Sequence, residues 1–376
     1  MSTVLTDAVE RERKQAGVRS LDLSFNELAD MYRTGELHIT PEYQRTFRWS
    51  GAKQSQFVES VVLEMPIPPI YAVEVGEGKW ELIDGLQRLS TYLHFRGQLD
   101  LPDQEPPIKK DHSFLTLEGC DIVPALNGFT FDKLPTSIQY RIRRATLRVE
   151  LVRQERNPRF AYYMFKRLNT GGEPLSNQEA RNCSIRLLGT TFSKFLTSLK
   201  SDAGFQECIA DVTDEYRARM GEEELILRFF AFKEKLAEYV HDIDPFLTGF
   251  MERATDESAP DHIAFSYFEQ ERQFRKTFKT LAAALGPAAC RRWVGTAYGG
   301  GFSVSHYEAF SIGLAKFADR IPNDPDQALI DSIAAALADA KKDPELRKLT
   351  TGGGKNFRSI YEKKIEIVAS RLQAVL

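Results

Sequence analysis

The sequence predicts an α+β protein whose first half combines a small β-sheet with helices and whose second half is entirely helical. Segments with the alternating apolar pattern of strands occur before about residue 187 and not after it. Beyond that point, apolar residues recur at the spacing of amphipathic helices, over 222–239, 265–285, 307–318 and 325–340. We therefore expect a flexible leader at 1–19, an α+β domain at 20–186 and a helical domain at 187–376.

Composition and charge exclude several classes of protein. The 376 residues are 42% hydrophobic and 27% charged, as in water-soluble globular proteins, and the net charge of −3 argues against a general nucleic-acid-coating protein. No apolar run approaches the roughly 20 residues that span a bilayer, and residues 1–19 lack a signal-peptide pattern, so we expect a cytoplasmic protein without membrane contact. The scattered cysteines and histidines show no metal-ligand spacing, so no metal-binding residues are predicted.

The N-terminal elements begin with a capping box, Ser24-Phe25-Asn26-Glu27, which starts a helix that ends near Gly35. A short strand follows at 37–39, and then an aromatic and basic segment, 41–49, leads into a helix at 50–63. This segment contains Tyr43, Gln44 and Arg45. It is either an aromatic loop with solvated arginines or part of a binding site.

The centre of this half is the stretch from Trp80 to Phe95. A hairpin of strands at 70–75 and 80–83 ends at Asp84-Gly85, and a helix with apolar residues at 86, 89 and 93 starts directly afterwards. A helix N-terminus after a strand offers free N–H groups and a positive dipole end, which favour phosphate. Gln87 and Arg88 lie in the first turn, where a guanidinium can bind phosphate bidentately. The alternative is that Asp84 only caps the helix and Arg88 is a solvated charge.

The rest of this half contains an excursion at 96–127, a helix at 132–144 and an alternating strand at 146–152. Asn157-Pro158 starts a helix that runs into Asn169-Thr170-Gly171-Gly172, and a second capping box follows at 176–179. The glycines either approach a ligand or form a helix C-cap. A glycine-rich stretch at 350–355 lacks Walker spacing and is interpreted as a linker.

Several short motifs occur together and in a fixed order. They are Pro41-Glu42-Tyr43-Gln44-Arg45 with Trp49, Glu59-Ser60, Pro66-Ile67-Pro68, Asp84-Gly85-Leu86-Gln87-Arg88, and Phe165-Lys166-Arg167-Leu168-Asn169-Thr170-Gly171-Gly172 followed by Leu175-Ser176 and Glu179. Over residues 20–185 the chain resembles the domain of unknown function 262 family, the GmrSD-type N-terminal domain. The resemblance implies a ParB/sulfiredoxin-like fold with a small mixed sheet. It also implies a role in bacterial defence against phage, through restriction or DNA sensing.

The resemblance and the strand–turn–helix pattern together predict a site for a nucleoside triphosphate with Mg²⁺. Asp84, Gln87 and Arg88 are assigned to catalysis of hydrolysis. The nucleotide-binding residues are expected to be Tyr43, Gln44, Arg45, Gly85, Thr91, Asn169, Thr170 and Gly171. Leu86 stands where the family motif usually has glutamine, which leaves hydrolysis open.

The sequence is also compatible with other functions. A basic stretch indicates either DNA binding or a solvated helix face, and comprises Arg141, Arg143, Arg144, Arg148, Arg153, Arg156 and Arg159. The chain is alternatively a non-catalytic adaptor for DNA or a partner, or a ParB-like DNA-nicking nuclease. The second half carries only His241, His262 and His306, with no His-Asn-His nuclease pattern, so a partner nuclease or other defence protein is the expected source of cleavage.

Overall fold

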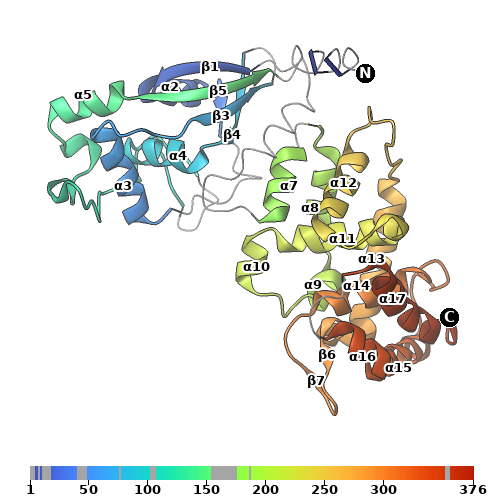
Figure 1. The fold of residues 1–376 in the computed structure, drawn as a ribbon. Helices are drawn as coiled ribbons and strands as arrows, with labels where there is room; N and C mark the ends of the chain where they lie inside the picture. Colours follow the sequence, from blue (N-terminus) through green and yellow to red (C-terminus); the bar gives the residue numbers. More distant parts are fainter. Residues whose placement is uncertain are drawn as a thin grey trace. The chain divides into compact units, whose positions relative to one another are not determined.

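The computed structural model describes residues 5–6, 9–10, 18–39, 49–75, 78–101, 107–153, 176–185, 188–351 and 356–376. The chain forms two compact units, Met1–Pro174 and Leu175–Leu376 (Figure 1). No helix in the described ranges is long and apolar enough to cross a membrane.

The first unit is built on a five-stranded mixed sheet with the order β1-β5-β3-β4-β2. Its elements are β1 (Val18–Ser24), α2 (Phe25–Thr34), β2 (Leu37–His38), α3 (Gly51–Val62), β3 (Ile70–Glu74), β4 (Trp80–Asp84), α4 (Leu86–Phe95), α5 (Thr136–Arg144) and β5 (Thr146–Arg153). The β1–β5 and β3–β4 pairs are antiparallel, whereas β3–β5 and β2–β4 are parallel. The prediction of an α+β unit with a small mixed sheet is confirmed.

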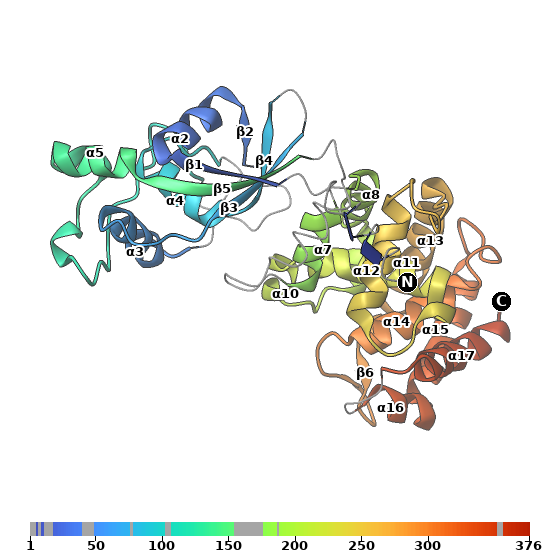
Figure 2. The same ribbon diagram turned by 45° about the horizontal axis from the view of Figure 1, so that its top comes forward.

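One face of this sheet carries the core of the first unit. Leu147, Val149 and Leu151 alternate along β5 and are buried together with side chains of α2, α3, α4 and α5. Figures 1 and 2 show β1 and β5 side by side, with α3 and α4 beneath the strands. The core includes a stacked pair from two helices, Phe25 and Tyr92, whose ring centroids are 4.8 Å apart. The period-two pattern of the strand therefore sets which face the helices cover.

Helix boundaries in this unit follow local signals. Ser24 accepts a hydrogen bond from the Glu27 N–H, as the capping box predicts, and Gly35 ends α2 with φ of 77°. Helix α5 is shorter than the predicted 132–144, because residues 131–133 form a separate 3₁₀ turn before Pro135. A proline at that position favours a restart of the helix after it.

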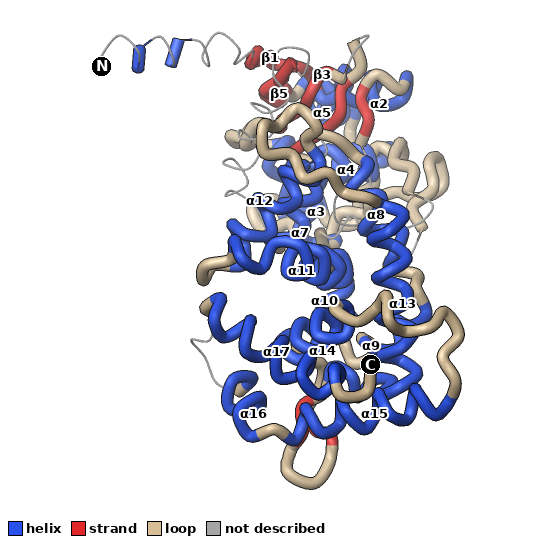
Figure 3. The backbone as a smooth tube through the Cα atoms, turned by 90° about the vertical axis from the view of Figure 1, so that its right-hand side faces the viewer, coloured by secondary structure: helices blue, strands red, loops and turns tan. Residues whose placement is uncertain are grey.

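The second unit consists mainly of helices: α7 (Asn177–Ile185), α8 (Thr191–Leu199), α9 (Ala203–Cys208), α10 (Asp214–Ala218), α11 (Gly221–Lys235), α12 (Ile243–Thr255), α13 (Tyr267–Leu285), α14 (Val304–Ala315), α15 (Gln327–Lys342), α16 (Pro344–Thr350) and α17 (Arg358–Gln373). Its core is rich in phenylalanine, and Phe229 and Phe230 of α11 are fully buried there. The prediction of an entirely helical second half needs one correction. Arg292–Trp293 (β6) and Tyr298–Gly299 (β7) form a short antiparallel hairpin, drawn in red in Figure 3.

A network of charged side chains lies inside the second unit. Arg228 of α11 binds Glu224 and the buried Glu308 of α14, with nitrogen–oxygen distances of 2.8 Å to both. Arg181 of α7 binds Glu224 at 2.7 Å and Asp244 of α12 at 3.1 Å. The buried charges of this network each have an opposite charge beside them, as burial requires, whereas the Asp244 side chain is 42% exposed. The network ties α7, α11, α12 and α14 to one another.

Candidate functional site

The turn between β4 and α4 has the geometry that the sequence predicts. Gly85 is the N-cap of α4 with φ of 104°, a left-handed conformation that side chains rarely adopt. A Cβ at Gly85 would also fall against the Ile70 side chain. Since the first N–H groups of a helix have no acceptor inside the helix, this tight turn places the positive end of α4 directly after the strand.

Arg88 is bound to protein acceptors. Its Nη2 donates to the Asp84 carboxylate at 2.7 Å, and its Nη1 donates to the carbonyl oxygens of Pro68 and, at 2.9 Å, Pro69. The Arg88 side chain is 14% exposed and that of Asp84 is 47% exposed. The guanidinium therefore fastens the start of α4 to the segment before β3. The sequence predicts that this group binds phosphate, with a solvated charge as the alternative, and neither interpretation includes the contacts with Asp84, Pro68 and Pro69.

Gln87 joins this turn to the end of the aromatic and basic segment. Its Oε1 accepts a hydrogen bond from the Trp49 N–H at 3.2 Å, and Trp49 directly precedes the N-cap of α3, Ser50. The Trp49 ring packs edge-on against Phe57 of α3, with centroids 5.7 Å apart. Residue 49 is thus fixed beside the first turn of α4.

Two residues of the first turns of α4 are buried in the core. Leu86 is buried among the apolar side chains of the first unit, so an apolar residue at this motif position is explained by packing. Thr91 is fully buried, and its hydroxyl donates to the Gln87 carbonyl at 2.7 Å. Thr91 therefore bonds to the helix backbone, and its assignment to nucleotide binding stays a prediction.

Tyr71 belongs to the same surroundings and was not predicted. In the sheet register, Tyr71 lies opposite Asp84 on β4 and Glu150 on β5, and Ser20 of β1 donates to Glu150 at 2.6 Å. Burial raises the pKa of Tyr71, the carboxylates of Glu150 and Asp84 raise it further, and Arg88 opposes them. Ser20, Tyr71, Asp84 and Glu150 occupy positions that alternate with core residues along their strands. This alternation is the sequence signal that could have predicted that these four residues share one face of the sheet.

The remaining predicted site residues lie outside the described residues. They are Tyr43, Gln44, Arg45, Asn169, Thr170 and Gly171. Within the described ranges, no group of three or more histidine, cysteine, aspartate or glutamate side chains is placed to hold a metal ion.

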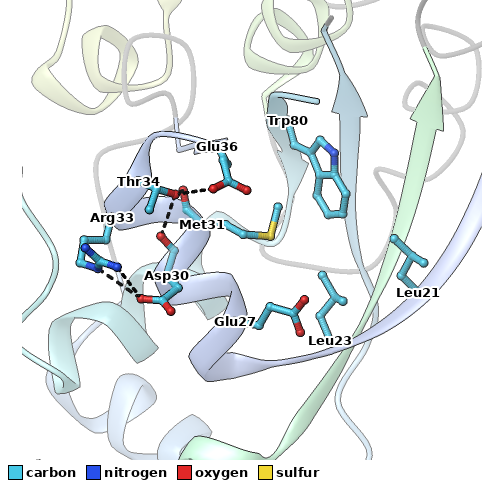
Figure 4. A pocket seen from close by; sticks show the side chains of 9 residues that line it. All are labelled: Leu21, Leu23, Glu27, Asp30, Met31, Arg33, Thr34, Glu36 and Trp80. Carbon is cyan, nitrogen blue, oxygen red and sulfur yellow. Dashed lines mark hydrogen bonds and ion pairs between the residues drawn. The ribbon is translucent and has the colours of Figure 1, made fainter. Parts of the chain in front are cut away.

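A pocket of about 460 Å³ lies between α2 and the sheet (Figure 4). Its polar lining includes Glu27, Asp30 and Glu36, and Arg33 is already bound to Asp30 at 3.0 Å. Three carboxylates around one neutralised arginine repel phosphate, so this pocket is not a nucleotide site. A second pocket, of about 660 Å³, lies between the ends of α3 and α5. Asp84, Gly85, Gln87 and Arg88 line neither of these pockets.

Comparison with known families places the first unit. Residues 25–186 match the family described as GmrSD restriction endonuclease, N-terminal domain, which confirms the resemblance found in the sequence. Comparison with curated proteins and with solved structures finds no match. The ParB-like fold therefore stays a prediction.

Proposed function

We propose, from the match of residues 25–186 to the GmrSD N-terminal family, that this chain is a restriction-type defence protein that binds and hydrolyses a nucleoside triphosphate. The family description names a restriction endonuclease. Residues 84–88 carry the motif on which the resemblance in the sequence rests, apart from Leu86. The mixed sheet followed by α4 also supports a ParB-like fold for the first unit.

The observation that carries the proposal is the hydrogen bond between Trp49 and Gln87. An extended chain advances at most about 3.6 Å per residue, and Arg45 precedes Trp49 by only four residues in the sequence. We therefore propose that Tyr43, Gln44 and Arg45 contribute to a site at the N-terminus of α4. A phosphate at the helix N-terminus and a cation from this segment would then form one site.

The proposed roles differ from those assigned by sequence. Helix N–H groups of α4 and the Arg45 guanidinium bind the phosphates, whereas Arg88 holds the turn in position through Asp84, Pro68 and Pro69. For Arg88 to bind phosphate itself, it would have to release these acceptors, and a half-exposed Asp84 would lose its ion pair.

Hydrolysis needs charge neutralisation and an oriented water more than covalent help. Gln87 lies in the first turn of α4, and its proposed role is to orient that water through its side-chain amide while its Oε1 keeps the hydrogen bond with the Trp49 N–H. Mg²⁺ arriving with the triphosphate would neutralise phosphate charge, and Asp84 is the nearby carboxylate that suits it, since Mg²⁺ commonly uses one protein carboxylate together with phosphate oxygens. A partner protein would then supply DNA cleavage.

Calorimetric titration of the full-length chain with triphosphates and Mg²⁺ tests the binding site. We expect Arg45→Ala to weaken binding about tenfold to a hundredfold, because a charge-assisted contact contributes about 1.5–3 kcal/mol. Arg33→Ala is the matched control, because this substitution removes the same charge from the same unit. Arg33 lies on α2, where it pairs with Asp30. Gln87→Ala should reduce phosphate release more than binding.

Absence of triphosphate binding by the unaltered chain would refute the nucleotide site. The defence role is tested separately by plating phage on cells with and without the chain. Unchanged plating across phages with modified and unmodified DNA would count against it.

A further inference from the structure

The second pocket of the first unit, which we call the α3–α5 pocket, is unrelated to the motif at residues 84–88. It has a volume of about 660 Å³ and is lined by Val61, Glu64, Met65, Ile67, Ser137, Tyr140, Arg141, Arg144, Ala145 and Thr146. Its size lies within the range of small-molecule sites. It combines apolar side chains, one aromatic ring and two arginines, which is the mixture that a nucleotide of a nucleic-acid strand requires.

The rim of the pocket is positively charged. The last turn of α5 exposes three arginines, Arg141, Arg143 and Arg144. Arg141 lies 3.7 Å from Glu64, with both side chains more than half exposed, so this pair is weak. Arg143 donates to the Asn26 side-chain oxygen at 3.3 Å, and within the described ranges neither Arg143 nor Arg144 is paired with a carboxylate. Cations in this state attract a phosphate backbone.

An exposed aromatic ring stands among these cations. Tyr140 is 50% exposed, and the Arg144 guanidinium lies 5.6 Å from its ring centroid. Met65, which lines the same pocket as Ile67, is 43% exposed. A ring that is open to solvent beside apolar groups offers a stacking surface for a base.

Backbone strain marks the same place. Glu64 follows α3 with φ of 55°, at a helix end where glycine is usual, and Met65 N–H donates to the Ser60 carbonyl at 3.0 Å. A charged residue in this conformation is disfavoured, and such positions concentrate at functional sites. The Glu64 carboxylate is an acceptor at the pocket wall, suited to an exocyclic amino group of a base.

We propose that the α3–α5 pocket binds one nucleotide of single-stranded DNA. The base stacks on Tyr140, and Arg141 and Arg144 bind the flanking phosphates. A stacked duplex hides the faces of its bases, so a single strand or an extruded nucleotide fits and an intact duplex does not. This proposal stands independently of the nucleoside triphosphate site, because none of the residues at the β4–α4 turn lines the pocket.

Fluorescence anisotropy of the full-length chain with a short labelled single strand of mixed sequence tests the proposal. Tyr140→Ala should weaken binding about tenfold, since stacking of one base on an aromatic side chain accounts for such a change. Tyr140→Phe keeps the ring and should bind like the unaltered chain. Arg144→Ala should weaken binding and flatten the dependence of log affinity on log salt by about 0.7, the share of one phosphate of a single strand.

Arg148→Ala is the control for charge alone. Arg148 lies on β5 outside the pocket, is exposed, and binds Asp22 at 2.9 Å. If the unaltered chain does not bind the single strand, if it prefers an intact duplex, or if Arg148→Ala weakens binding as much as Arg144→Ala, the proposal is wrong. Thermal melting of each variant verifies that these exposed substitutions leave the fold intact.

Discussion

At the scale of single residues, the two side chains that open α4 are structural ties. Arg88 joins the helix to the Pro68 and Pro69 carbonyls and to Asp84, and Gln87 joins it to the backbone of Trp49. Such contacts hold a turn whose glycine adopts φ of 104°. A binding site is better pre-organised when the residues around it fix the backbone in this way.

Arg88→Ala is expected to destabilise the first unit by about 1.5–3 kcal/mol, because hydrogen bonds to charged groups contribute about that much. Arg88→Lys should restore only part, since an ammonium cannot reproduce the planar fork that reaches two carbonyls and a carboxylate. Thermal melting measures both variants. Arg33→Ala, which breaks an exposed pair, should cost less than about 1 kcal/mol. Equal melting temperatures for Arg88→Ala and Arg33→Ala would contradict the structural role.

At the scale of elements, two helices of the first unit end with different residue types in the same left-handed backbone conformation. Both α2 and α3 end with a residue in the left-handed region, Gly35 with φ of 77° and Glu64 with φ of 55°. Glycine adopts this conformation without a steric penalty and glutamate does not. Helix α3 therefore ends less favourably than α2, directly at the α3–α5 pocket.

Glu64→Gly is expected to stabilise the first unit by about 0.5–1 kcal/mol, because it relieves the left-handed strain. The substitution also removes the exposed contact with Arg141, which lowers the free energy of unfolding only slightly. Chemical denaturation gives the free energies. Gly35→Ala provides the reverse comparison and should cost about 1 kcal/mol, since nothing lies within 4 Å of the added Cβ and the penalty is conformational alone. A destabilised Glu64→Gly variant would show that the carboxylate matters more than the strain.

At the scale of the whole molecule, the second unit buries ionisable groups that sequence reasoning treated only as candidates for a nuclease. His306 lies inside the unit, where its Nδ1 is 3.2 Å from the Ser303 hydroxyl and its ring stacks on Phe310. Burial, followed by the nearby charges of Lys341, Arg292 and Lys364, lowers the pKa of His306 to about 3. A histidine held neutral in the core makes folding depend on pH.

The free energy of unfolding of the second unit should fall as the pH drops below about 6.5, towards the folded pKa of about 3. The unfolded state binds the proton first, so the expected slope from His306 approaches about 1.4 kcal/mol per pH unit. Between pH 6.5 and 5, where most carboxylates remain ionised, His306→Gln should flatten this dependence. Parent and variant both carry Trp49→Phe and Trp80→Phe, so that Trp293 is the one remaining tryptophan. Its fluorescence during denaturation then reports on the second unit. Equal slopes for the variant and its parent would contradict the buried neutral histidine.

The sequence by itself determined the local features of this protein. The alternation of Leu147, Val149 and Leu151 predicted a strand with one buried face, and the box at Ser24–Glu27 predicted a helix start. Asp84-Gly85 predicted the turn that opens α4. These features depend on the conformational preferences of neighbouring residues and on hydrophobic periodicity, and both follow from the order of the amino acids alone.

Only the tertiary structure decided the partners of the long side chains. Arg88 reaches carbonyl oxygens about twenty residues earlier in the chain, Gln87 binds a residue 38 positions away, and the α3–α5 pocket joins segments that are far apart in sequence. The short hairpin at Arg292–Gly299 also escaped prediction, because two residues per strand are too few to show a pattern. A flexible side chain has many possible partners, and the packing of distant elements selects among them.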